Sequence, residues 1–294
     1  MKHEKDALYK AYIALLKLKK HIIEKAMARA KRHYIPGYIW HITHRCHKRE
    51  FLLKFNKDKQ RWLQWLYQAK KRYGLTLLNY SVTSNHIHLL VVGDNDRDVI
   101  PKSMQLIAGR TGQEFNQRKR RKGAFWEDRY HATAIEQDEH LFRCIVYIDL
   151  NMVRAGVVGH PSEWPFGGYN EIQQPKRKNI LINYEKLREL LGFESYDAMK
   201  AYHEKLVNNF MNNEDSIFND KWTRSIAVGS KNFVEQVKSK LGVKVKAREV
   251  KEADEAYQLR EPPASYNAFF DVENEDIEPE NTCFWSVYPE QSVG

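Results

Sequence analysis

The chain has 294 residues, enough for one large domain or two modest ones, and 42% of them are hydrophobic, which allows an ordinary buried core. No apolar run approaches the roughly 20 residues of a membrane-spanning helix and no signal peptide is visible, so a membrane protein is not expected. The three scattered cysteines argue against a disulfide framework and predict a protein of the reducing cytoplasm.

The net charge of +10 is distributed unevenly along the chain. Residues 252–294 contain eleven Asp and Glu against one Arg, a net charge of −10, so residues 1–251 carry +20. A body this basic predicts a polyanionic partner, and nucleic acid is favoured over a membrane surface. The acidic tail is rich in Pro and Glu and is expected to be extended.

Hydrophobic periodicity predicts the elements in chain order. A lysine-rich helix is expected first, over residues 5–33, and Pro36-Gly37 ends it. Four strands follow at 38–44, 75–81, 86–92 and 130–135, with helices at 57–73, 101–118 and 138–153. The order βαββαβ with one added helix predicts an α+β fold built on a ferredoxin-like (split βαβ) antiparallel sheet.

The composition predicts four parts of the chain. They are a basic N-terminal helix at 1–33, an α+β domain at 34–174, a small helical region at 175–251 and an acidic extended tail at 252–294. Within the helical region, helices are expected at 184–191, 195–209 and 232–241.

Two histidines in the third predicted strand are the first candidate site residues. Because side chains alternate along a strand, His86 and His88 share one face, about 6–7 Å apart at the backbone. Two imidazoles so placed can bind one cation, although a His-x-His pair alone is more often a pair of partly exposed histidines.

A distant helix supplies the second half of the constellation. Tyr147 and Asn151 lie four residues apart and therefore share one helix face. A core tyrosine is the simpler interpretation of Tyr147, but an amide on a packed face needs a polar partner, and a metal is one. If this face lies across the histidines, His86, His88 and Asn151 surround a divalent cation, and Tyr147 lies beside it as a nucleophile toward a phosphodiester.

Basic and aromatic residues around these elements predict contacts with nucleic acid. The basic run at 118–122 follows a helix, and Phe125-Trp126 nearby could stack on bases. The predicted DNA-binding residues are Arg118, Lys119, Arg120, Arg121, Lys122, Trp126, Arg129, Arg143 and Arg154.

Several motifs together resemble a known family. They are Ser84-Asn85-His86-Ile87-His88-Leu89, Gly123-Ala124-Phe125-Trp126-Glu127-Asp128-Arg129-Tyr130, Tyr147-Ile148-Asp149-Leu150-Asn151 and Trp164-Pro165-Phe166-Gly167-Gly168-Tyr169. Over residues 34–170 the chain resembles the REP-associated tyrosine transposases, relatives of the HUH-type, single-tyrosine insertion-sequence transposases. The segment 223–235 resembles the C-terminal helical region of longer members.

The resemblance implies a fold, an activity and roles for single residues. It implies an HUH nuclease domain in which His86, His88 and Asn151 bind Mg²⁺ or Mn²⁺ and Tyr147 attacks DNA. The implied reaction is cleavage and rejoining of single-stranded DNA at palindromic or hairpin repeats, through a 5′-phosphotyrosine link, by a monomer or homodimer. Where the family usually has Asn-Pro, this chain has Asn151-Met152, so its helix is expected to continue.

The sequence admits three other interpretations. The stretch His41-Ile42-Thr43-His44-Arg45-Cys46-His47 could hold zinc or form half of a two-histidine phosphodiesterase, but neither pattern has its second half. A nucleic-acid-binding regulator without catalysis could use the same fold and basic face. The presence of His86, His88, Tyr147 and Asn151 together favours the enzyme.

Overall fold

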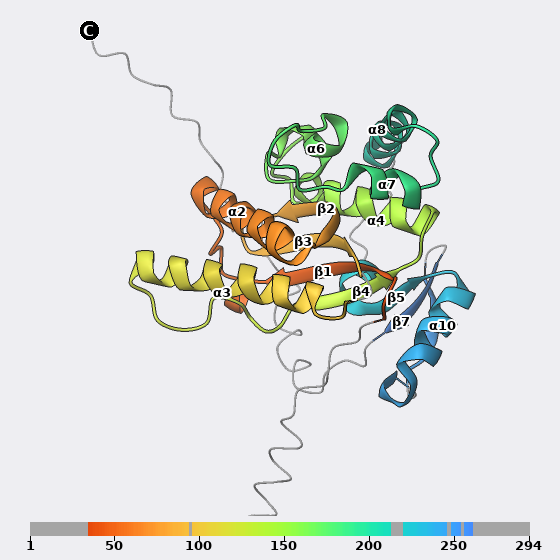
Figure 1. Ribbon diagram of the computed structural model, residues 1–294, viewed down its shortest axis with the longest axis horizontal. Helices are drawn as coiled ribbons and strands as arrows, with labels where there is room; N and C mark the ends of the chain where they lie inside the picture. The colour runs from red at the N-terminus through yellow and green to blue at the C-terminus, as the bar shows by residue number, and fades with distance from the viewer. Residues whose placement is uncertain (1–34, 94–95, 213–219, 246–247, 254–255, 261–294) are drawn as a thin grey trace, which may run out of the picture. The chain divides into compact units, whose positions relative to one another are not determined.

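A seven-stranded sheet in the order β2-β3-β1-β4-β5-β7-β6 organises the protein in the computed structural model (Figure 1). The structure describes residues 35–93, 96–212, 220–245, 248–253 and 256–260. The helix predicted at 1–33 lies outside the described residues, as does the acidic tail from residue 261 onward.

The first half of the sheet has the predicted topology. Its elements are β1 (Ile39–Arg45), α2 (Asn56–Tyr73), β2 (Thr76–Val82), β3 (His86–Val92), α3 (Val99–Lys119) and β4 (His131–Ile135), with η1 (His47–Arg49) after β1. β1 pairs antiparallel with both β3 and β4, and β2 pairs antiparallel with β3. The βαββαβ order and this pairing confirm the α+β, ferredoxin-like sheet expected from the sequence.

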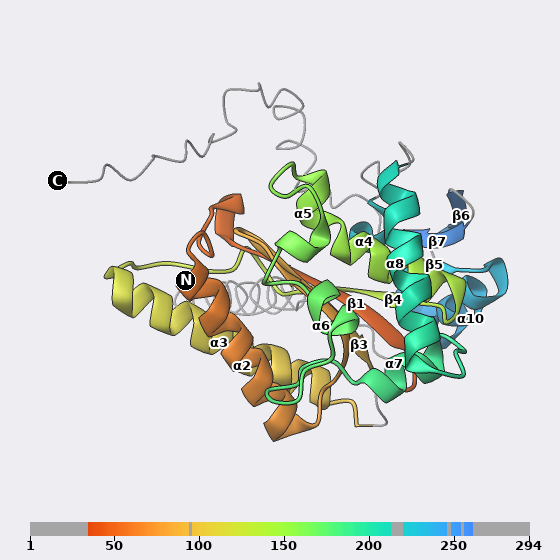
Figure 2. The same ribbon diagram turned by 90° about the horizontal axis from the view of Figure 1, so that it is seen from above.

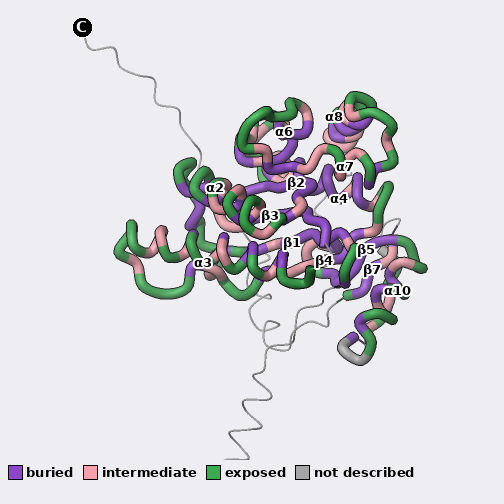
Figure 3. Tube along the Cα trace, in the orientation of Figure 1, coloured by how far each residue is buried: buried purple, intermediate pink, exposed green. Residues whose placement is uncertain are grey.

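Local sequence explains these elements. Helix α2 buries Trp62, Leu66 and Ala69, which recur at helical spacing, and each large apolar side chain contributes roughly 1.5–3 kcal/mol when buried. It ends where Gly74 adopts a φ of 74°, a left-handed conformation that glycine takes without a Cβ clash. In β3 every residue from Ile87 to Val92 is buried, as expected for a strand covered on both faces (Figure 3).

Helices cover the two faces of β1 and β3. Seen from above, α2 and α3 lie together on one side, and α4 (Glu139–Asp149) lies on the other side with α8 (Tyr196–Asn212) (Figure 2). The strand register aligns Thr43 with His88, and His41 with Thr133. Residues directly opposite in neighbouring strands point to the same face, so this polar row of side chains lies on the α4 side of the sheet.

The helix predicted at 138–153 is divided into α4 and α5 (Asn151–Arg154). Leu150 between them has φ −78° and ψ 2°, so its ψ lies outside the α-helical region. The amide of Leu150 still donates to the carbonyl of Val146 at 2.9 Å, and the amide of Arg154 donates to that of Leu150 at 2.9 Å. The helix that was expected to continue through Asn151-Met152 is therefore interrupted at Leu150, and these two hydrogen bonds carry the chain from α4 directly into α5.

The C-terminal half contains strands where only helices were predicted. The elements after α5 are η2 (Pro161–Glu163), α6 (Tyr169–Gln173), α7 (Tyr184–Leu190), α8, α9 (Lys221–Arg224), β5 (Ser225–Gly229), α10 (Lys231–Leu241), η4 (Gly242–Val245), β6 (Val250–Ala253) and β7 (Ala256–Arg260). The predicted helices at 184–191, 195–209 and 232–241 correspond to α7, α8 and α10. The strands are the correction, because β5 joins β4 in parallel and β7 follows β5 in the same sheet.

This pairing also bears on the predicted parts of the chain. The sheet crosses the limit predicted at residue 174, and the described residues from Ile35 onward cluster as one unit. The described residues at the start of the predicted tail lie in the strands β6 and β7, in which Ala256 and Leu259 are buried. The other domain limits stay predictions.

The outer edge of β2 is covered by the tryptophan- and glycine-rich motif. The amide of Val82 donates to Phe166 at 3.0 Å, and Gly168 donates to Tyr80 at 2.7 Å. A Cβ at Gly168 would lie 2.0 Å from Oδ1 of Asn79, so only glycine fits here without displacing that amide. The motif therefore closes an edge that would otherwise expose unpaired backbone groups.

A buried polar pair fastens α8 to α4. Nε2 of His203 lies 2.8 Å from Oδ2 of Asp149, and the amide of Asn79 donates to Oδ1 of Asp149 at 3.0 Å. Both members of the pair are almost completely buried. The pair holds in place the helix that carries Tyr147.

Replacing Asp149 by Ala is expected to lower the free energy of unfolding by about 3 kcal/mol, because His203 and Asn79 lose their buried partner. The matched control is Asp197→Ala, since that carboxylate is 92% exposed on α8 and pairs only with Lys200. The control should cost less than about 0.5 kcal/mol. Urea denaturation measures both variants, and equal midpoints for the two would contradict the prediction.

Among the described residues, no helix is long and apolar enough to cross a membrane.

Candidate functional site

The two histidines of β3 lie on the face covered by α4. His88 is buried and His86 is half-buried, and their ring centroids are 5.0 Å apart in an edge-to-face arrangement. The alternation predicted for the strand therefore holds, with Ile87 buried between them on the opposite side.

Asn151 connects the helix to both imidazoles. Its Nδ2 lies 3.2 Å from Nε2 of His88, and its side chain also hydrogen-bonds to His86. The other ring nitrogen of His86, Nδ1, lies 2.6 Å from Oδ1 of Asn85 and 3.0 Å from the Thr83 hydroxyl. The structure thus brings together the three residues that the sequence proposed as metal ligands.

Burial keeps both imidazoles neutral. It lowers the pKa of His86 to about 4, with the positive charge of Arg45 acting in the same direction. Burial, followed by the neighbouring His86 and His41, holds the pKa of His88 well below its usual value of 6.5. Near pH 7 each ring therefore carries one lone pair, which is the form that binds a metal.

Tyr147 lies beside the imidazoles, in a nearly closed position. It is 6% exposed, and its ring centroid is 5.9 Å from that of His88 and 6.1 Å from that of Trp222 in α9. The guanidinium of Arg154 lies 4.3 Å from the ring centroid, and Nη2 of Arg154 donates to the Tyr147 carbonyl at 2.6 Å.

Two opposing effects act on the hydroxyl of Tyr147. Burial raises its pKa, whereas the positive charge of Arg154 and a hydrogen bond with the Thr223 side chain lower it. A tyrosine is a poor nucleophile at neutral pH unless a nearby cation stabilises its phenolate. Arg154 is the side chain in this position, about two helical turns after Tyr147 in the chain.

The donor set of His86, His88 and Asn151 fits a divalent cation. Within the described residues, no group of three or more His, Cys, Asp or Glu side chains gathers in a way that could hold a metal. Here the imidazole nitrogens of His86 and His88 converge on the side-chain amide of Asn151. Flipping this amide by 180° would exchange its nitrogen and oxygen, so that the oxygen faces the imidazoles. Imidazole and amide oxygen together suit Mn²⁺ better than Mg²⁺, which prefers oxygen ligands.

The members of the predicted basic run, which follows α3, differ in their contacts. Arg118 pairs with the buried Asp58, and Nη1 of Arg121 donates to the Ala124 carbonyl at 2.8 Å, so these two stabilise the loop itself. The other three residues of the run, Lys119, Arg120 and Lys122, are exposed. Further along the same loop, the amide of Glu127 donates to the carbonyl of Arg45 at 3.0 Å, and Arg45 lies opposite His86 in the pairing of β1 with β3.

The remaining predicted DNA-binding residues are less concentrated. Trp126 stacks on His44 with centroids 4.1 Å apart and donates to the Ala108 carbonyl at 3.0 Å, so packing already covers part of its ring. Arg143 donates to Glu139 at 2.7 Å on the outer side of α4. Arg129 is exposed in the same loop as Trp126. Their roles in DNA binding stay predictions.

Replacing Lys119, Arg120 and Lys122 by Gln together is expected to weaken DNA binding and to reduce the slope of log affinity against log salt by about 2, because up to three phosphate contacts are lost. The triple replacement of Lys186, Lys200 and Lys205 by Gln on α7 and α8 is the matched control and should leave the slope unchanged. Fluorescence anisotropy at four salt concentrations measures both. Equal slopes for the two variants would assign the run to the solvated surface.

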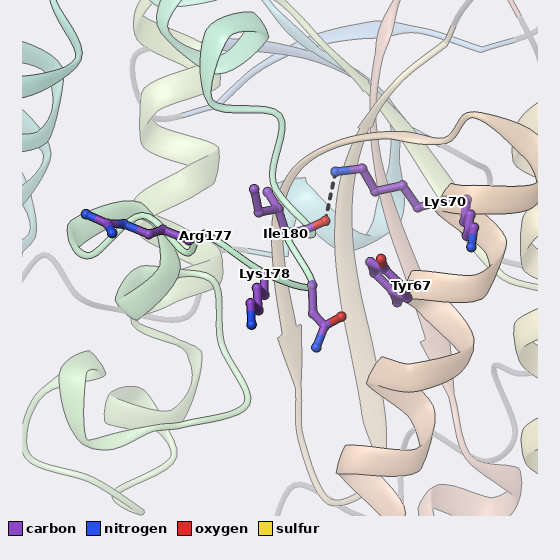
Figure 4. Close-up of a pocket in the computed structure, with 7 residues that line it drawn as sticks. Tyr67, Lys70, Arg177, Lys178 and Ile180 are labelled. Carbon is purple, nitrogen blue, oxygen red and sulfur yellow. Dashed lines mark hydrogen bonds between the residues drawn. The ribbon is translucent and has the colours of Figure 1, made fainter.

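A second basic surface is formed by α2 together with the segment at 177–180. An open cavity of about 610 Å³ is lined by Tyr67, Lys70, Lys71, Arg177, Lys178, Asn179 and Ile180 (Figure 4). Lys70 closes its inner wall by donating to the carbonyls of Ile180 at 3.0 Å and Leu181 at 2.8 Å. No residue of the candidate site lines it.

Two residues of the site were not predicted as members of it. His41 of β1 stacks on His88 with centroids 5.1 Å apart, and Trp222 covers Tyr147 from α9. Alternation in the first strand could have identified His41, because its neighbours across the sheet determine which face it shares. No pattern in the local sequence identifies Trp222. It reaches the site only because β5, which follows α9 in the chain, pairs with β4.

The comparisons with known proteins agree with the sequence motifs. Residues 34–151 match the family described as IS200-like transposases. Among solved structures, a REP-associated tyrosine transposase bound to a REP hairpin is 22% identical, covers 49% of this chain and 84% of its own, and has a TM-score of 0.41. A protein of Deinococcus radiodurans R1 assigned as a transposase is 16% identical, covers 44% of this chain and 97% of its own, and has a TM-score of 0.30.

No curated protein matches the chain. The family resemblance expected from the motifs is nevertheless confirmed over residues 34–151, which match the IS200-like transposases and contain all of those motifs except the one at 164–169.

Proposed function

We propose that this protein is a metal-dependent endonuclease and strand transferase that acts on single-stranded or hairpin DNA. The observation that carries the proposal is the meeting of His86, His88 and Asn151 with Tyr147 on one face of the sheet. The IS200-like transposase family of residues 34–151 supports a reaction on DNA. The exposed basic side chains of Lys119, Arg120 and Lys122 support a polyanionic substrate.

In the proposed reaction, Oη of Tyr147 attacks a DNA phosphorus. A bond forms between Oη and phosphorus, and the bond from phosphorus to the 3′ oxygen breaks. The phenol loses its proton and the leaving 3′ oxygen gains one, so the products are a 5′-phosphotyrosine and a free 3′ hydroxyl. Because the phosphoester bond is kept in the intermediate, the reverse attack can rejoin a strand.

The residues of the chain have distinct tasks in this scheme. Arg154 stabilises the phenolate of Tyr147, and His86, His88 and Asn151 would hold the cation, Mn²⁺ or Mg²⁺. The bound cation would act as a Lewis acid on the phosphate that is attacked. The free, buried thiols of Cys46 and Cys144 suit the reducing cytoplasm where such DNA is found.

One observation favours a second candidate, a DNA-binding regulator without catalysis. Tyr147 is 6% exposed, so its hydroxyl must become accessible before it can attack a phosphate. A regulator would use the basic loop and leave this tyrosine in the core.

One experiment separates the two candidates. The protein is incubated with Mn²⁺ and an end-labelled oligonucleotide that has a hairpin and a single-stranded flank. The nuclease should form a covalent protein–DNA adduct whose peptide maps to Tyr147. Tight binding without any adduct, at all metal concentrations used, would support the regulator.

A further inference from the structure

The environment of His41 determines where its protons lie. This side chain is completely buried, and both of its ring nitrogens have partners. Nδ1 lies 2.8 Å from the carbonyl oxygen of Trp222, and Nε2 lies 2.9 Å from Nδ1 of His88.

The Trp222 carbonyl determines which atom donates and which accepts in each hydrogen bond from His41 to His88. A carbonyl oxygen can only accept, so Nδ1 of His41 must carry the proton that it donates to Trp222. In a neutral imidazole the other nitrogen is then an acceptor, so Nε2 of His41 accepts from Nδ1 of His88. The proton of His88 is thereby placed on Nδ1, and its Nε2 is left with a lone pair directed at Asn151.

The opposite arrangement would leave buried groups unpaired. If His88 carried its proton on Nε2, its Nδ1 would need a proton from His41, whose Nδ1 would then face the Trp222 carbonyl without one. Doubly protonating His41 would resolve this conflict, but it would place a positive charge on a completely buried ring. Near pH 7 a single tautomer of both rings satisfies all the contacts.

The tautomer of His86 is also fixed by a hydrogen-bond partner, but this partner is an amide instead of an imidazole. Its Nδ1 lies 2.6 Å from Oδ1 of Asn85, which accepts a proton and leaves Nε2 of His86 with the lone pair. Both histidines of β3 therefore keep Nε2 unprotonated, one through an amide and the other through a second imidazole. Partners of this type orient metal-binding histidines and fix their tautomers.

We propose that His41 is a positioning residue that fixes the tautomer of His88, so that Nε2 of His88 is available to a divalent cation. The inference rests on the proposed function, since it concerns the cation of the same site. It adds a residue from β1 and, through the Trp222 carbonyl, makes the site depend on α9. His41 itself does not contact the cation.

The test uses variants that separate hydrogen bonding from packing. His41→Phe keeps a ring but cannot accept a proton from His88, whereas His41→Gln can accept one through its amide oxygen. Thr133→Val is the matched control, because the Thr133 hydroxyl also donates to the Trp222 carbonyl, at 3.0 Å, but does not contact His88. Circular dichroism verifies that each full-length variant is folded.

Two measurements are made without DNA. Long-range ¹H–¹⁵N correlation spectra of ¹⁵N-histidine protein give the tautomer of His88, and electron paramagnetic resonance gives the dissociation constant for Mn²⁺. His88 should be protonated at Nδ1 in the wild type, in Thr133→Val and in His41→Gln. In His41→Phe this tautomer should be lost, and Mn²⁺ should bind roughly 10- to 100-fold more weakly.

Retention of both the tautomer and the Mn²⁺ affinity in His41→Phe would overturn the inference, and so would an Nε2-protonated His88 in the wild type. Since neither measurement uses DNA, these results leave the attack by Tyr147 untouched. Conversely, a missing covalent adduct refutes the proposed nuclease without changing the tautomer of His88.

Discussion

Tyr147→Phe is expected to abolish the covalent DNA adduct and to lower the cleavage rate by roughly three orders of magnitude or more, because the attacking oxygen is removed. The phenyl ring that remains can still pack between His88, Trp222 and Arg154. Folding and DNA affinity should therefore stay near the wild-type values. Single-turnover cleavage of a labelled hairpin substrate measures the rate, and fluorescence anisotropy measures the affinity.

The control for this variant is Tyr202→Phe. Tyr202 is 46% exposed on α8, so the substitution removes a tyrosine hydroxyl far less buried than that of Tyr147. Its cleavage rate should equal that of the wild type. If Tyr147→Phe cleaved DNA as fast as this control, Tyr147 would have no part in the reaction.

The position of Tyr147 sets a condition for the reaction. Trp222 and Arg154 cover its ring, and burial raises the pKa of its hydroxyl. Attack on a phosphate therefore requires the hydroxyl to leave the Thr223 side chain and face the substrate. The substrate phosphate would be attracted by Arg154, the cation that already lies over the ring.

The sequence was sufficient to predict the core of the site because its signals are local. Alternation in β3 places His86 and His88 on one face, and the spacing of four in the helix pairs Tyr147 with Asn151. Both are set by the geometry of a single element. That the two elements meet was a hypothesis drawn from the residue types, and the contact between Asn151 and His88 supports it.

What the sequence did not predict depends on contacts between distant segments. Strand β5 is five residues long, and it is stabilised by parallel pairing with β4, about 90 residues earlier in the chain. Such a short apolar run carries no period that distinguishes strand from helix. Because β5 was missed, α9 before it was missed as well, and with it the carbonyl of Trp222 that orients His41.

For the charged residues too, the sequence predicts the local feature but not the contacts with distant segments. The basic run at 118–122 was predicted as a surface that contacts phosphates. In the structure Arg118 and Arg121 are engaged with Asp58 and Ala124, so only part of the run is free of such contacts. The sequence identifies a basic loop by composition, but which members stabilise the loop depends on partners from α2 and the loop itself. A test of DNA binding must therefore separate the exposed members from the structural ones.

His86→Ala and removal of divalent cations are expected to lower cleavage to the same level, each by at least about 100-fold, because both remove the proposed metal. His86 is the better position for this test than His88, since it is half-buried and its loss disturbs the core less. In the presence of a chelator, the wild type and His86→Ala should cleave equally slowly. Two changes that act through one metal are not additive.

The matched control is His160→Ala. His160 is a half-buried histidine whose Nδ1 lies 2.7 Å from the Ser162 hydroxyl in η2. This variant should retain the wild-type rate with Mn²⁺ and lose it with chelator, as the wild type does. Mn²⁺ affinity, measured by electron paramagnetic resonance, should fall only in His86→Ala. Undiminished cleavage by the wild type in chelator would show that the imidazoles serve the reaction without a metal, and His86 would then have to be assigned a direct contact with DNA.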